Sequence, residues 1–415
     1  MAKILISTII SNDLGPIMRM LPIANILRDS SHEVIFCNRS WAPIKIIKEN
    51  NFQNYSTIEP NHSPKVWPEV ITPEIWNGNQ GMAYEGFLDL EYVRDLVSTY
   101  IKLLDEVKPD IVVDTWNQAS CTAAKAKHIP LVTINQADLH PEGNGLIWWK
   151  EPPDDLPNPI PVVNQVLSEL NLPLIKKKVE ELFLGDLVLV VGTPETDPLP
   201  KTAKVTYIGS LQKISRNDEL PESIQNYPKD KPLIWVYSGN PRYGSNPSFT
   251  DSIVIIRASI SVLGKEDVRV VLSTGYQPLP EEFVKLPSNF QFEKFIPGFA
   301  MAKRADLFVH HGGHGSYLTG LSAGTPAIII PTFSERESNA RRVAQLGAGL
   351  FVLPFERKDG EKDVSLDEFR DKVKLVLSDK SYKKNAQSVA QKMSRYSGPE
   401  LAAQLILDFM KKNIV

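Results

Sequence analysis

The sequence contains little cysteine, no long apolar run and no marked excess of charge of one sign. Two of its 415 residues are cysteines, Cys37 and Cys121, and both lie in apolar or small-residue runs. This count excludes a disulfide framework and predicts two buried free thiols, as in a protein of a reducing compartment. We therefore expect a cytoplasmic protein.

The lack of long apolar runs excludes most kinds of membrane attachment. No stretch approaches the ~18 apolar residues of a membrane span, and the apolar run within residues 1–7 is too short for a signal peptide. Two segments leave room for at most peripheral membrane contact, the apolar residues 146–149 and the basic residues 176–178. Loop packing and a solvated helix face are the simpler interpretations of these segments.

The charge balance excludes a further class of partner. Lys and Arg total 46 and Asp and Glu total 49, for a net charge of −3. This near-neutral balance gives no electrostatic basis for binding nucleic acid, and it leaves the oligomeric state open. With 42% apolar and 23% charged residues, the composition is that of an ordinary globular protein. The length predicts two domains of roughly 200 residues each.

Short β-branched runs alternate with amphipathic stretches along the whole chain, which predicts parallel, doubly wound sheets. In the first half we expect strands at 3–8, 33–37, 111–114, 131–135 and 187–192, with helices at 17–27 and 119–128. In the second half we expect strands at 233–237, 268–273, 290–295, 307–310 and 327–330, with helices at 251–263, 339–346 and 367–377. Residues 60–100, rich in Pro, Trp and Tyr, are expected to form an irregular excursion over a binding surface.

The alternation stops after Gly209, where residues 213–232 are polar, charged and proline-bearing. Such a segment is typical of a linker between domains. We therefore predict an N-terminal domain over 1–212, a linker over 213–232 and a C-terminal domain over 233–397. Because Gly398-Pro399 breaks the last helical region, a separate helix is expected within 398–415, packed back on the N-terminal domain.

Glycine and histidine gather in one short segment. Residues 310–316 read His-His-Gly-Gly-His-Gly-Ser, between an apolar run at 306–309 and a helix-like stretch at 317–323. A strand–loop–helix of this kind directs backbone N–H groups and the positive end of a helix at one anion. Glycines such as Gly313 let the backbone approach a phosphate because they lack a Cβ. The segment predicts a phosphate or diphosphate site with an imidazole, whereas three histidines without a nearby Cys or carboxylate disfavour zinc.

From Phe295 to Gly349 the chain resembles the donor-binding signature of family 1 glycosyltransferases. The matching residues are the sequence FIPG at 295–298, the loop at 310–316, AGTP at 323–326, Pro331, the Glu-Arg pair at 335–336 and the Asn-Ala pair at 339–340. Weaker matches lie at 15–24, 32–34 and 236–240. The resemblance implies a GT-B fold, in which two Rossmann-like domains of α/β class face each other across a cleft.

The resemblance also implies the residues that hold the donor. His311 would bind the α-phosphate of a nucleotide-sugar. The backbone amides of Gly315 and Ser316, with the Ser316 hydroxyl, would hold the diphosphate. Gly239 and Asn240 would close over it from the other side. No cofactor or metal is expected, because the Asp-x-Asp motif that holds a divalent cation in glycosyltransferases of the other fold is absent from this chain.

The other donor contacts differ from the family pattern in informative ways. Phe295 matches a tryptophan that stacks on the base, and the Ile296 backbone would read the base edge. Glu335 and Arg336 match an acidic-Gln pair on the sugar hydroxyls, and the arginine implies that the sugar need not be glucose. Thr319 stands where many members have a glutamate on the ribose. A threonine resembles the bacterial antibiotic-type enzymes, whose donors are often dTDP-sugars.

The catalytic base is the largest departure, since the family's histidine after the opening glycine is replaced by Pro16. A missing general base typically costs about 10²–10⁴-fold in rate. Asp13 and Asp114, each at the end of a predicted strand, are the candidates for this role, with a helix cap or turn former as the simpler interpretation. His140 could reach the cleft, although a surface position is the simpler expectation.

We therefore expect an inverting, metal-independent glycosyltransferase. It would move a sugar from a UDP- or dTDP-sugar to a small acceptor held by the N-terminal domain, such as a natural product, a lipid or a saccharide. Pro16 favours an alternative, a glycosyltransferase-like auxiliary or binding protein without turnover. A nucleotide-sugar epimerase needs several carboxylates around the sugar, and only Glu335 and Glu337 are present there.

Overall fold

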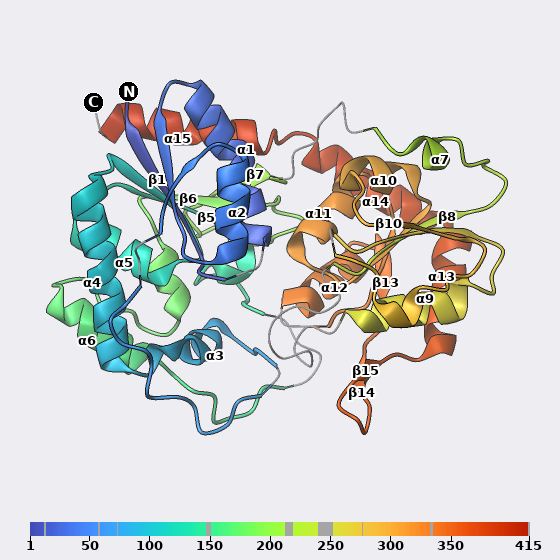
Figure 1. The fold of residues 1–415 in the computed structure, drawn as a ribbon, viewed down its shortest axis with the longest axis horizontal. Helices are drawn as coiled ribbons and strands as arrows, with labels where there is room; N and C mark the ends of the chain where they lie inside the picture. Colours follow the sequence, from blue (N-terminus) through green and yellow to red (C-terminus); the bar gives the residue numbers. More distant parts are fainter. Residues whose placement is uncertain are drawn as a thin grey trace. The chain divides into compact units, whose positions relative to one another are not determined.

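The computed structural model describes residues 1–11, 14–56, 59–72, 74–146, 151–211, 219–239, 252–275, 277–332 and 335–413. The chain divides into two compact units (Figure 1). The N-terminal unit comprises Met1–Gly145, Lys150–Lys213 and Tyr396–Val415. The C-terminal unit comprises Leu146–Trp149 and Ile214–Arg395. Each unit is described by itself below.

The N-terminal unit is built on a seven-stranded parallel sheet of order β3-β2-β1-β4-β5-β6-β7. The strands are β1 (Lys3–Thr8), β2 (Glu33–Cys37), β3 (Gln53–Tyr55), β4 (Ile111–Thr115), β5 (Leu131–Asn135), β6 (Leu187–Val191) and β7 (Thr206–Gly209). The main helices are α1 (Gly15–Asp29), α2 (Trp41–Glu49), α3 (Gly78–Met82), α4 (Leu90–Val107), α5 (Gln118–Ala126) and α6 (Ile160–Glu169). Short turns are η1 (Ala83–Phe87), η2 (Ala137–Leu139) and η3 (Val179–Phe183). The strand order reverses between β1 and β4, so the loops after these two strands diverge to leave a crevice where such sheets bind ligands.

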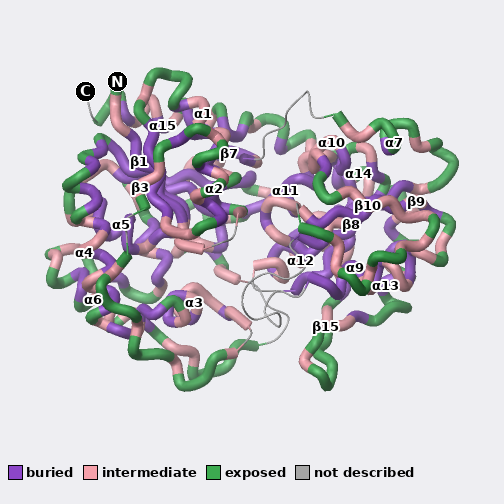
Figure 2. The backbone as a smooth tube through the Cα atoms, viewed as in Figure 1, coloured by how far each residue is buried: buried purple, intermediate pink, exposed green. Residues whose placement is uncertain are grey.

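The central strands of this unit are rich in buried apolar residues because helices cover both faces of a parallel sheet. Figure 2 shows the resulting buried centre of the unit in purple. Helix α4 supplies much of one cover, with Leu96, Tyr100 and Leu104 in the core. Asp89 caps the helix by accepting a hydrogen bond from the Tyr92 backbone. The irregular excursion expected over 60–100 is therefore wrong for its last part, which is this 18-residue amphipathic helix.

The C-terminal helix α15 (Pro399–Asn413) belongs to the N-terminal unit, where it packs against α1 and β7 (Figure 1). Its buried residues are Pro399, Ala402, Ala403, Ile406 and Met410. Gly398 precedes the helix and has a left-handed φ of +62°. Its position also leaves no room for a Cβ, since that atom would lie 2.2 Å from the Ser210 carbonyl oxygen. Glycine is required here for both reasons.

The C-terminal unit has a six-stranded parallel sheet of order β10-β9-β8-β11-β12-β13. Its strands are β8 (Leu233–Tyr237), β9 (Arg269–Ser273), β10 (Phe290–Glu293), β11 (Leu307–His310), β12 (Ala327–Ile329) and β13 (Gly349–Phe351). Its helices are α7 (Glu222–Gln225), α9 (Ile253–Leu263), α10 (Gly298–Arg304), α11 (His314–Ser322), α12 (Glu335–Gln345), α13 (Leu366–Ser378) and α14 (Lys380–Met393), with the turn η4 (Glu281–Phe283). A hairpin of β14 (Phe355–Glu356) and β15 (Lys362–Asp363) completes it. Here the order reverses between β8 and β11.

The predicted strands are confirmed to within two residues at each end in both units. The sequence interpretation missed the short edge strands β3, β7 and β13 and the helices α2, α6 and α14. No described helix is both long and apolar enough to cross a membrane.

Candidate nucleotide-sugar site

The glycine–histidine loop lies at the point where the C-terminal sheet reverses its strand order. Strand β11 ends at His310, the loop follows at 311–313, and α11 begins at His314. His310 pairs with Tyr237, the last residue of β8, so the loops after the two strands start side by side. The carboxyl ends of two strands at such a reversal form the crevice where doubly wound sheets bind ligands.

Two glycines lie against the His311 imidazole, and a third, Gly312, lies against Arg336. A Cβ on Gly313 would lie 2.5 Å from His311 Nε2, and a Cβ on Gly239 would lie 2.9 Å from its Cε1. Gly312 has a φ of +89°, and a Cβ there would lie 2.9 Å from the Arg336 carbonyl oxygen. Any larger residue at these positions would displace the imidazole or the loop, so the glycines are required for this geometry.

His311 is nearly enclosed, with 9% of its surface exposed. Burial, together with the nearby charge of Arg336 and the neighbouring His310, lowers its pKa well below the usual value, against a smaller raising effect from the Tyr237 backbone. The imidazole is therefore neutral at pH 7 and keeps one N–H for donation to an oxygen. A neutral donor suits a phosphate oxygen without adding a fixed charge.

Helix α12 holds the other side of the loop. Asn339 Nδ2 donates to the Gly312 carbonyl oxygen at 2.8 Å, and Arg342 Nη1 donates to Asn339 Oδ1 at 3.3 Å. Arg336 donates from Nη1 to the hydroxyls of Thr332 and Ser252, which fixes its guanidinium beside the loop. The loop is thereby braced, and a cation lies close to it.

Helix α11 directs its N-terminus at the same place. Its N-cap residue is Gly313, which supplies no side-chain cap, and Gly315 and Ser316 follow in the first turn. The N–H groups of a helix's first turn have no partner within the helix and carry a partial positive charge. Thr319 is buried, and its hydroxyl donates to the Gly315 carbonyl oxygen at 2.8 Å, so it stabilises the turn that holds these amides.

The predicted base and sugar contacts occupy different surroundings. Phe295, in the loop after β10, has half of its surface exposed, as a residue that stacks on a ligand would. Ile296 is buried and packs in the cluster of Trp235 and Met301. Glu335 is the first residue of α12 and is half-buried next to Arg336. Asn240 lies outside the described residues.

The two other histidines of the loop have structural surroundings. His310 is buried, stacks on Phe308 at 4.4 Å between ring centroids, and accepts a hydrogen bond at Nδ1 from the Gly312 amide at 3.1 Å. Burial lowers its pKa to about 3. His314 is buried against Tyr317. The described residues include no group of three His, Cys, Asp or Glu arranged to bind a metal.

The N-terminal unit has a second reversal point, between β1 and β4, with different residues. Pro16 is buried in the first turn of α1, where proline is tolerated. The Arg19 guanidinium lies 5.6 Å from the centroid of the Trp116 ring. Trp116 follows β4 with a φ of +63°, an uncommon conformation for a large residue, and its buried Nε1 has no hydrogen-bond partner among the described residues. Strained residues of this kind cluster at functional sites.

Asn117 fixes the loop after β4. Its side chain caps α5 by accepting from the Ser120 amide at 3.1 Å, and its Nδ2 donates to the Thr8 carbonyl oxygen at 3.0 Å and to the Tyr100 hydroxyl at 2.7 Å. Its own amide donates to Asp114 Oδ1 at 3.0 Å. Trp116 and Gln118 on either side of it are thus held in place.

Asp114, predicted as a candidate base, is completely buried. It lies in one row of the sheet with Ser7 of β1, Cys37 of β2 and Thr133 of β5. Burial raises its pKa to about 7, against opposing hydrogen bonds from Asn117, Cys121 and the serines at 7 and 120. An acceptor hydroxyl cannot touch this carboxyl in the structure as it stands, so the simpler interpretation as a structural residue gains support.

The other predictions for the N-terminal unit concern Asp13, the two cysteines and His140. Asp13 lies outside the described residues. Cys37 and Cys121 are buried and free, as expected. The expectation of a surface position for His140 is wrong, because only 5% of this residue is exposed and its Nδ1 accepts from the Glu142 amide. Burial lowers the pKa of His140.

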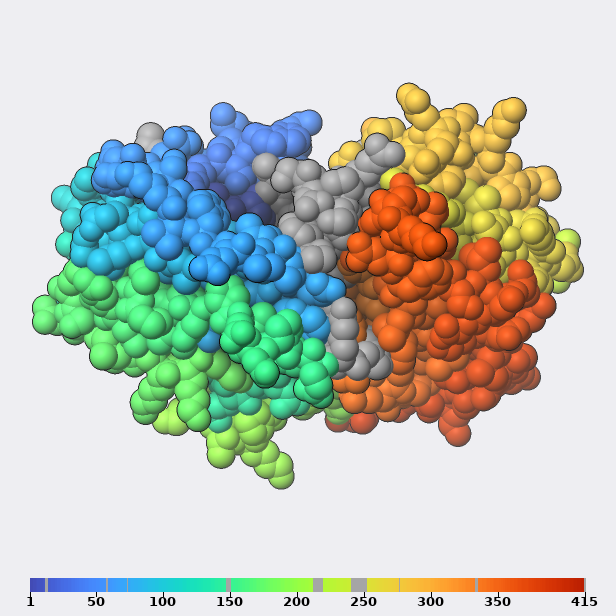
Figure 3. All heavy atoms as spheres, turned by 90° about the horizontal axis from the view of Figure 1, so that it is seen from below, coloured from blue at the N-terminus to red at the C-terminus, as the bar shows by residue number. Residues whose placement is uncertain are grey.

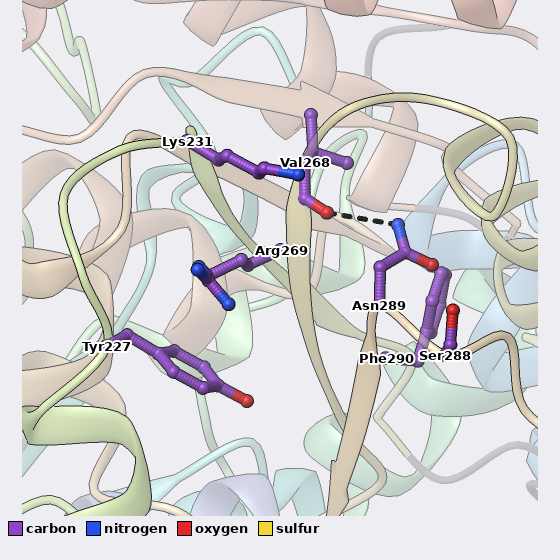
Figure 4. A pocket seen from close by; sticks show the side chains of 7 residues that line it. All are labelled: Tyr227, Lys231, Val268, Arg269, Ser288, Asn289 and Phe290. Atoms are coloured by element: carbon purple, nitrogen blue, oxygen red, sulfur yellow. Dashed lines mark hydrogen bonds between the residues drawn. The ribbon is translucent and has the colours of Figure 1, made fainter.

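A hollow of about 330 Å³ elsewhere in the C-terminal unit does not belong to this site (Figure 4). It lies near the start of β9 and β10, at Arg269 and Phe290, whereas the glycine loop follows the end of β11. Its two cations are already paired, Arg269 with Asp230 at 3.1 Å and Lys231 with Asp267. The hollow therefore lies at the amino ends of the strands, whereas the glycine loop lies at their carboxyl ends.

Comparisons with known proteins agree with this geometry. Residues 257–407 match the family model described as "Erythromycin biosynthesis protein CIII-like, C-terminal domain". NDP-glycosyltransferase YjiC of Bacillus subtilis (strain 168) is 29% identical over 194 residues, which are 47% of this chain and 46% of YjiC. The chain thus matches about half of that relative's length. 4'-Demethylrebeccamycin synthase of Lentzea aerocolonigenes is 24% identical over 93% of this chain and 94% of its own.

A solved structure supports the fold over the full length. Glycosyltransferase VinC in complex with dTDP has a TM-score of 0.67 at 18% identity, and the likeness covers 97% of this chain and 98% of VinC. This likeness confirms the predicted GT-B fold.

Proposed function

We propose that the chain is a nucleotide-sugar glycosyltransferase of family 1 and of the natural-product type, which transfers a sugar from a nucleoside diphosphate sugar to a hydroxyl group of a small acceptor. The transfer inverts the anomeric centre and needs no metal ion. The C-terminal unit binds the donor and the N-terminal unit binds the acceptor.

The observation that carries the proposal is the set of donors around the glycine loop. The His311 imidazole, the first-turn amides of α11 and the Arg336 guanidinium gather where the strand order reverses. When the glycosidic bond to the donor breaks, negative charge develops on the leaving diphosphate and the sugar gains oxocarbenium character. Fixed N–H donors and a nearby cation stabilise that charge without reorganising, which is the role a divalent cation has in metal-dependent enzymes.

Two features favour a dTDP-sugar over a UDP-sugar. At the position where many family members have a glutamate on the ribose, this chain has Thr319, whose hydroxyl is bonded to the Gly315 carbonyl oxygen. No carboxylate is therefore offered to a ribose 2′-hydroxyl from this position. VinC, which shares the fold, was solved with dTDP.

The acceptor that we propose is apolar with a free hydroxyl. Four apolar residues in the segment before α3 are strongly exposed: Val66 (50%), Trp67 (47%), Val70 (69%) and Ile71 (56%). In Figure 3 this part of the chain, coloured blue, lies at the surface. Such a run exposed together suits contact with an apolar ligand.

A second candidate function follows from Pro16. Without a histidine at this position, the chain could hold a nucleotide-sugar or support a partner enzyme without turning over. Donor binding is common to both candidates, and only turnover separates them.

The test starts with thermal unfolding of the full chain in the presence of UDP, dTDP, GDP or ADP, with a chelator throughout. We expect dTDP or UDP to raise the melting temperature, and we expect the His311→Ala variant to show a smaller shift while keeping the melting temperature of the free protein. Hydrolysis or transfer of the corresponding nucleotide-sugar then separates enzyme from auxiliary protein. Absence of any shift would contradict both candidates.

A further inference from the structure

We propose that Glu85 is the catalytic base that takes the proton from the acceptor hydroxyl, a role that Pro16 cannot perform. The proposal rests on the proposed glycosyl transfer. It concerns a residue that no sequence pattern singles out, and it follows from how the turn η1 meets the start of α5.

Glu85 lies beside the reversal point of the N-terminal sheet. Gln118, the first residue of α5 and the second after Trp116, donates from Nε2 to Glu85 Oε2 at 3.4 Å. The loop that carries Gln118 is itself fixed to β1 through Asn117 and the Thr8 carbonyl oxygen. The carboxylate is therefore next to the crevice that the loops after β1 and β4 leave, and it remains exposed to solvent.

The turn that carries Glu85 is irregular and packs against the segment before α3. Residues 83–87 form a kinked turn between α3 and α4, in which Gly86 has a φ of +92°. A Cβ on Gly86 would lie 2.4 Å from Pro64 Cγ, so the apolar excursion packs directly on this turn. The Tyr84 hydroxyl also accepts a hydrogen bond from the Thr72 amide of the excursion at 2.9 Å.

No cation neutralises Glu85 in the described part of the chain. Helix α3 has no charged residue, and the one charged residue of α5, Lys125, donates to the Leu182 carbonyl oxygen. On α4, Glu91 pairs with Arg94, and the N-cap Asp89 accepts from the Lys65 amide at 2.8 Å. Gln118 is thus the polar partner of Glu85, and it is neutral.

These surroundings give Glu85 the properties of a base. Protein atoms packed around the carboxylate raise its pKa to about 7, with the Gln118 hydrogen bond opposing, although part of the side chain still meets solvent. A general base works best when its pKa lies near the working pH. Asp114 has a similar pKa but is completely buried, whereas Glu85 is accessible.

The step balances without a further reactant. The acceptor O–H bond breaks and its proton moves to a Glu85 carboxylate oxygen, while the acceptor oxygen forms a bond to the anomeric carbon. The bond from that carbon to the diphosphate oxygen breaks, and its electron pair stays on the nucleoside diphosphate. Glu85 later releases the proton to solvent.

The experiment compares the wild type with Glu85→Gln on two acceptors, 2-phenylethanol and 4-nitrophenol, using dTDP-glucose and UDP-glucose as donors. The aliphatic alcohol needs a base, whereas a substantial fraction of 4-nitrophenol is already ionised at neutral pH. We expect kcat/KM for the alcohol to fall by about 10²–10⁴-fold in the variant and to lose its acid limb near pH 7, with less than about a tenfold change for 4-nitrophenol. Glu106→Gln, an exposed glutamate of α4, is the matched control and should change neither rate.

Nucleotide binding keeps this test separate from the proposed function. Glu85→Gln should bind dTDP and UDP as the wild type does, because the donor residues lie in the other unit. Equal loss of rate on both acceptors would make Glu85 a structural residue, and an unchanged rate on the alcohol would exclude it as the base. A wild type that binds nucleotide but neither transfers to these probes nor hydrolyses the donor would also overturn the proposal, whereas failure to bind nucleotide would overturn the proposed function itself.

Discussion

The two sheets of the molecule reverse their strand order at the same point, after their first strand, yet the two reversal points contain opposite chemistry. In the C-terminal unit the point holds glycines, a neutral imidazole and a guanidinium, all suited to an anion. In the N-terminal unit it holds Pro16, Trp116 and the carboxylate of Glu85. Under the proposed function, the same topology serves the leaving diphosphate in one unit and the incoming hydroxyl in the other, because the topology fixes the place and the loop residues fix the chemistry.

The largest effect on nucleotide binding is expected when a side chain is added inside the glycine loop. Gly313→Ala would place a Cβ 2.5 Å from His311 Nε2, so the imidazole or the loop must move. We expect the affinity for dTDP or UDP to fall at least about a thousandfold, since several donors are misplaced together. Isothermal titration measures this. Gly81→Ala, whose Cβ would meet only a side-chain atom at 3.4 Å, is the control and should bind normally. Normal binding by Gly313→Ala would show that the loop does not hold the nucleotide.

The buried carboxyl of the N-terminal unit gives a stability test. Because the pKa of Asp114 is about 7 in the folded chain and 3.8, its ordinary value, in the unfolded chain, the folded chain keeps a proton that the unfolded chain has lost between these pH values. The free energy of unfolding should therefore fall as pH rises from 4 to 7, by up to about 4 kcal/mol from this group. Asp114→Asn should remove this slope.

Comparing the wild type with Asp114→Asn isolates the contribution of the Asp114 carboxyl to the pH dependence of stability. The buried histidines His310 and His311 oppose this contribution, but they do so equally in both proteins. Denaturant unfolding at several pH values measures it. If the free energy of unfolding depended on pH in the same way in the wild type and in Asp114→Asn, the raised pKa of the buried Asp114 carboxyl would be contradicted.

Removing the imidazole should have a smaller effect than filling the loop. His311→Ala deletes one donor and leaves the glycines in place, so we expect dTDP affinity to fall by about ten- to a hundredfold, the range for a hydrogen bond to a charged group. The His128→Ala variant changes an exposed histidine and serves as the control. Unchanged affinity in His311→Ala would exclude the phosphate contact.

The guanidinium beside the loop should contribute least. Arg336→Gln retains hydrogen-bonding capacity toward Thr332 and Ser252 but removes the charge. We expect dTDP affinity to fall a few-fold and its dependence on salt to become weaker. Titrations at low and high ionic strength measure this, and an unchanged salt dependence would show that the charge does not act on the ligand.

The sequence predicted the parts of this comparison that depend on local patterns. Apolar runs such as 233–237 and 307–310 identify buried parallel strands because no other element tolerates them so well. The loop at 310–316 was found because its glycines and histidines are adjacent in sequence. Short strands such as Gln53–Tyr55 carry no apolar run, so they were missed.

The acceptor side could not be predicted in the same way, because it depends on contacts distant in sequence. Glu85 is positioned by its hydrogen bond to Gln118, 33 residues away, and by the packing of Pro64 on Gly86. Asp114 was selected for its position at the end of a strand, and only the register with Ser7 and Cys37 shows that it points into a covered face. Neither fact is visible in a local pattern.

The most direct test of the central claim, that the reversal point of the C-terminal sheet binds a nucleoside diphosphate, is titration of the full chain with dTDP and with UDP in the presence of a chelator. The account predicts saturable binding of at least one of them, lost in Gly313→Ala and weakened in His311→Ala. Absence of binding by the wild type, or binding that both variants retain unchanged, would contradict it.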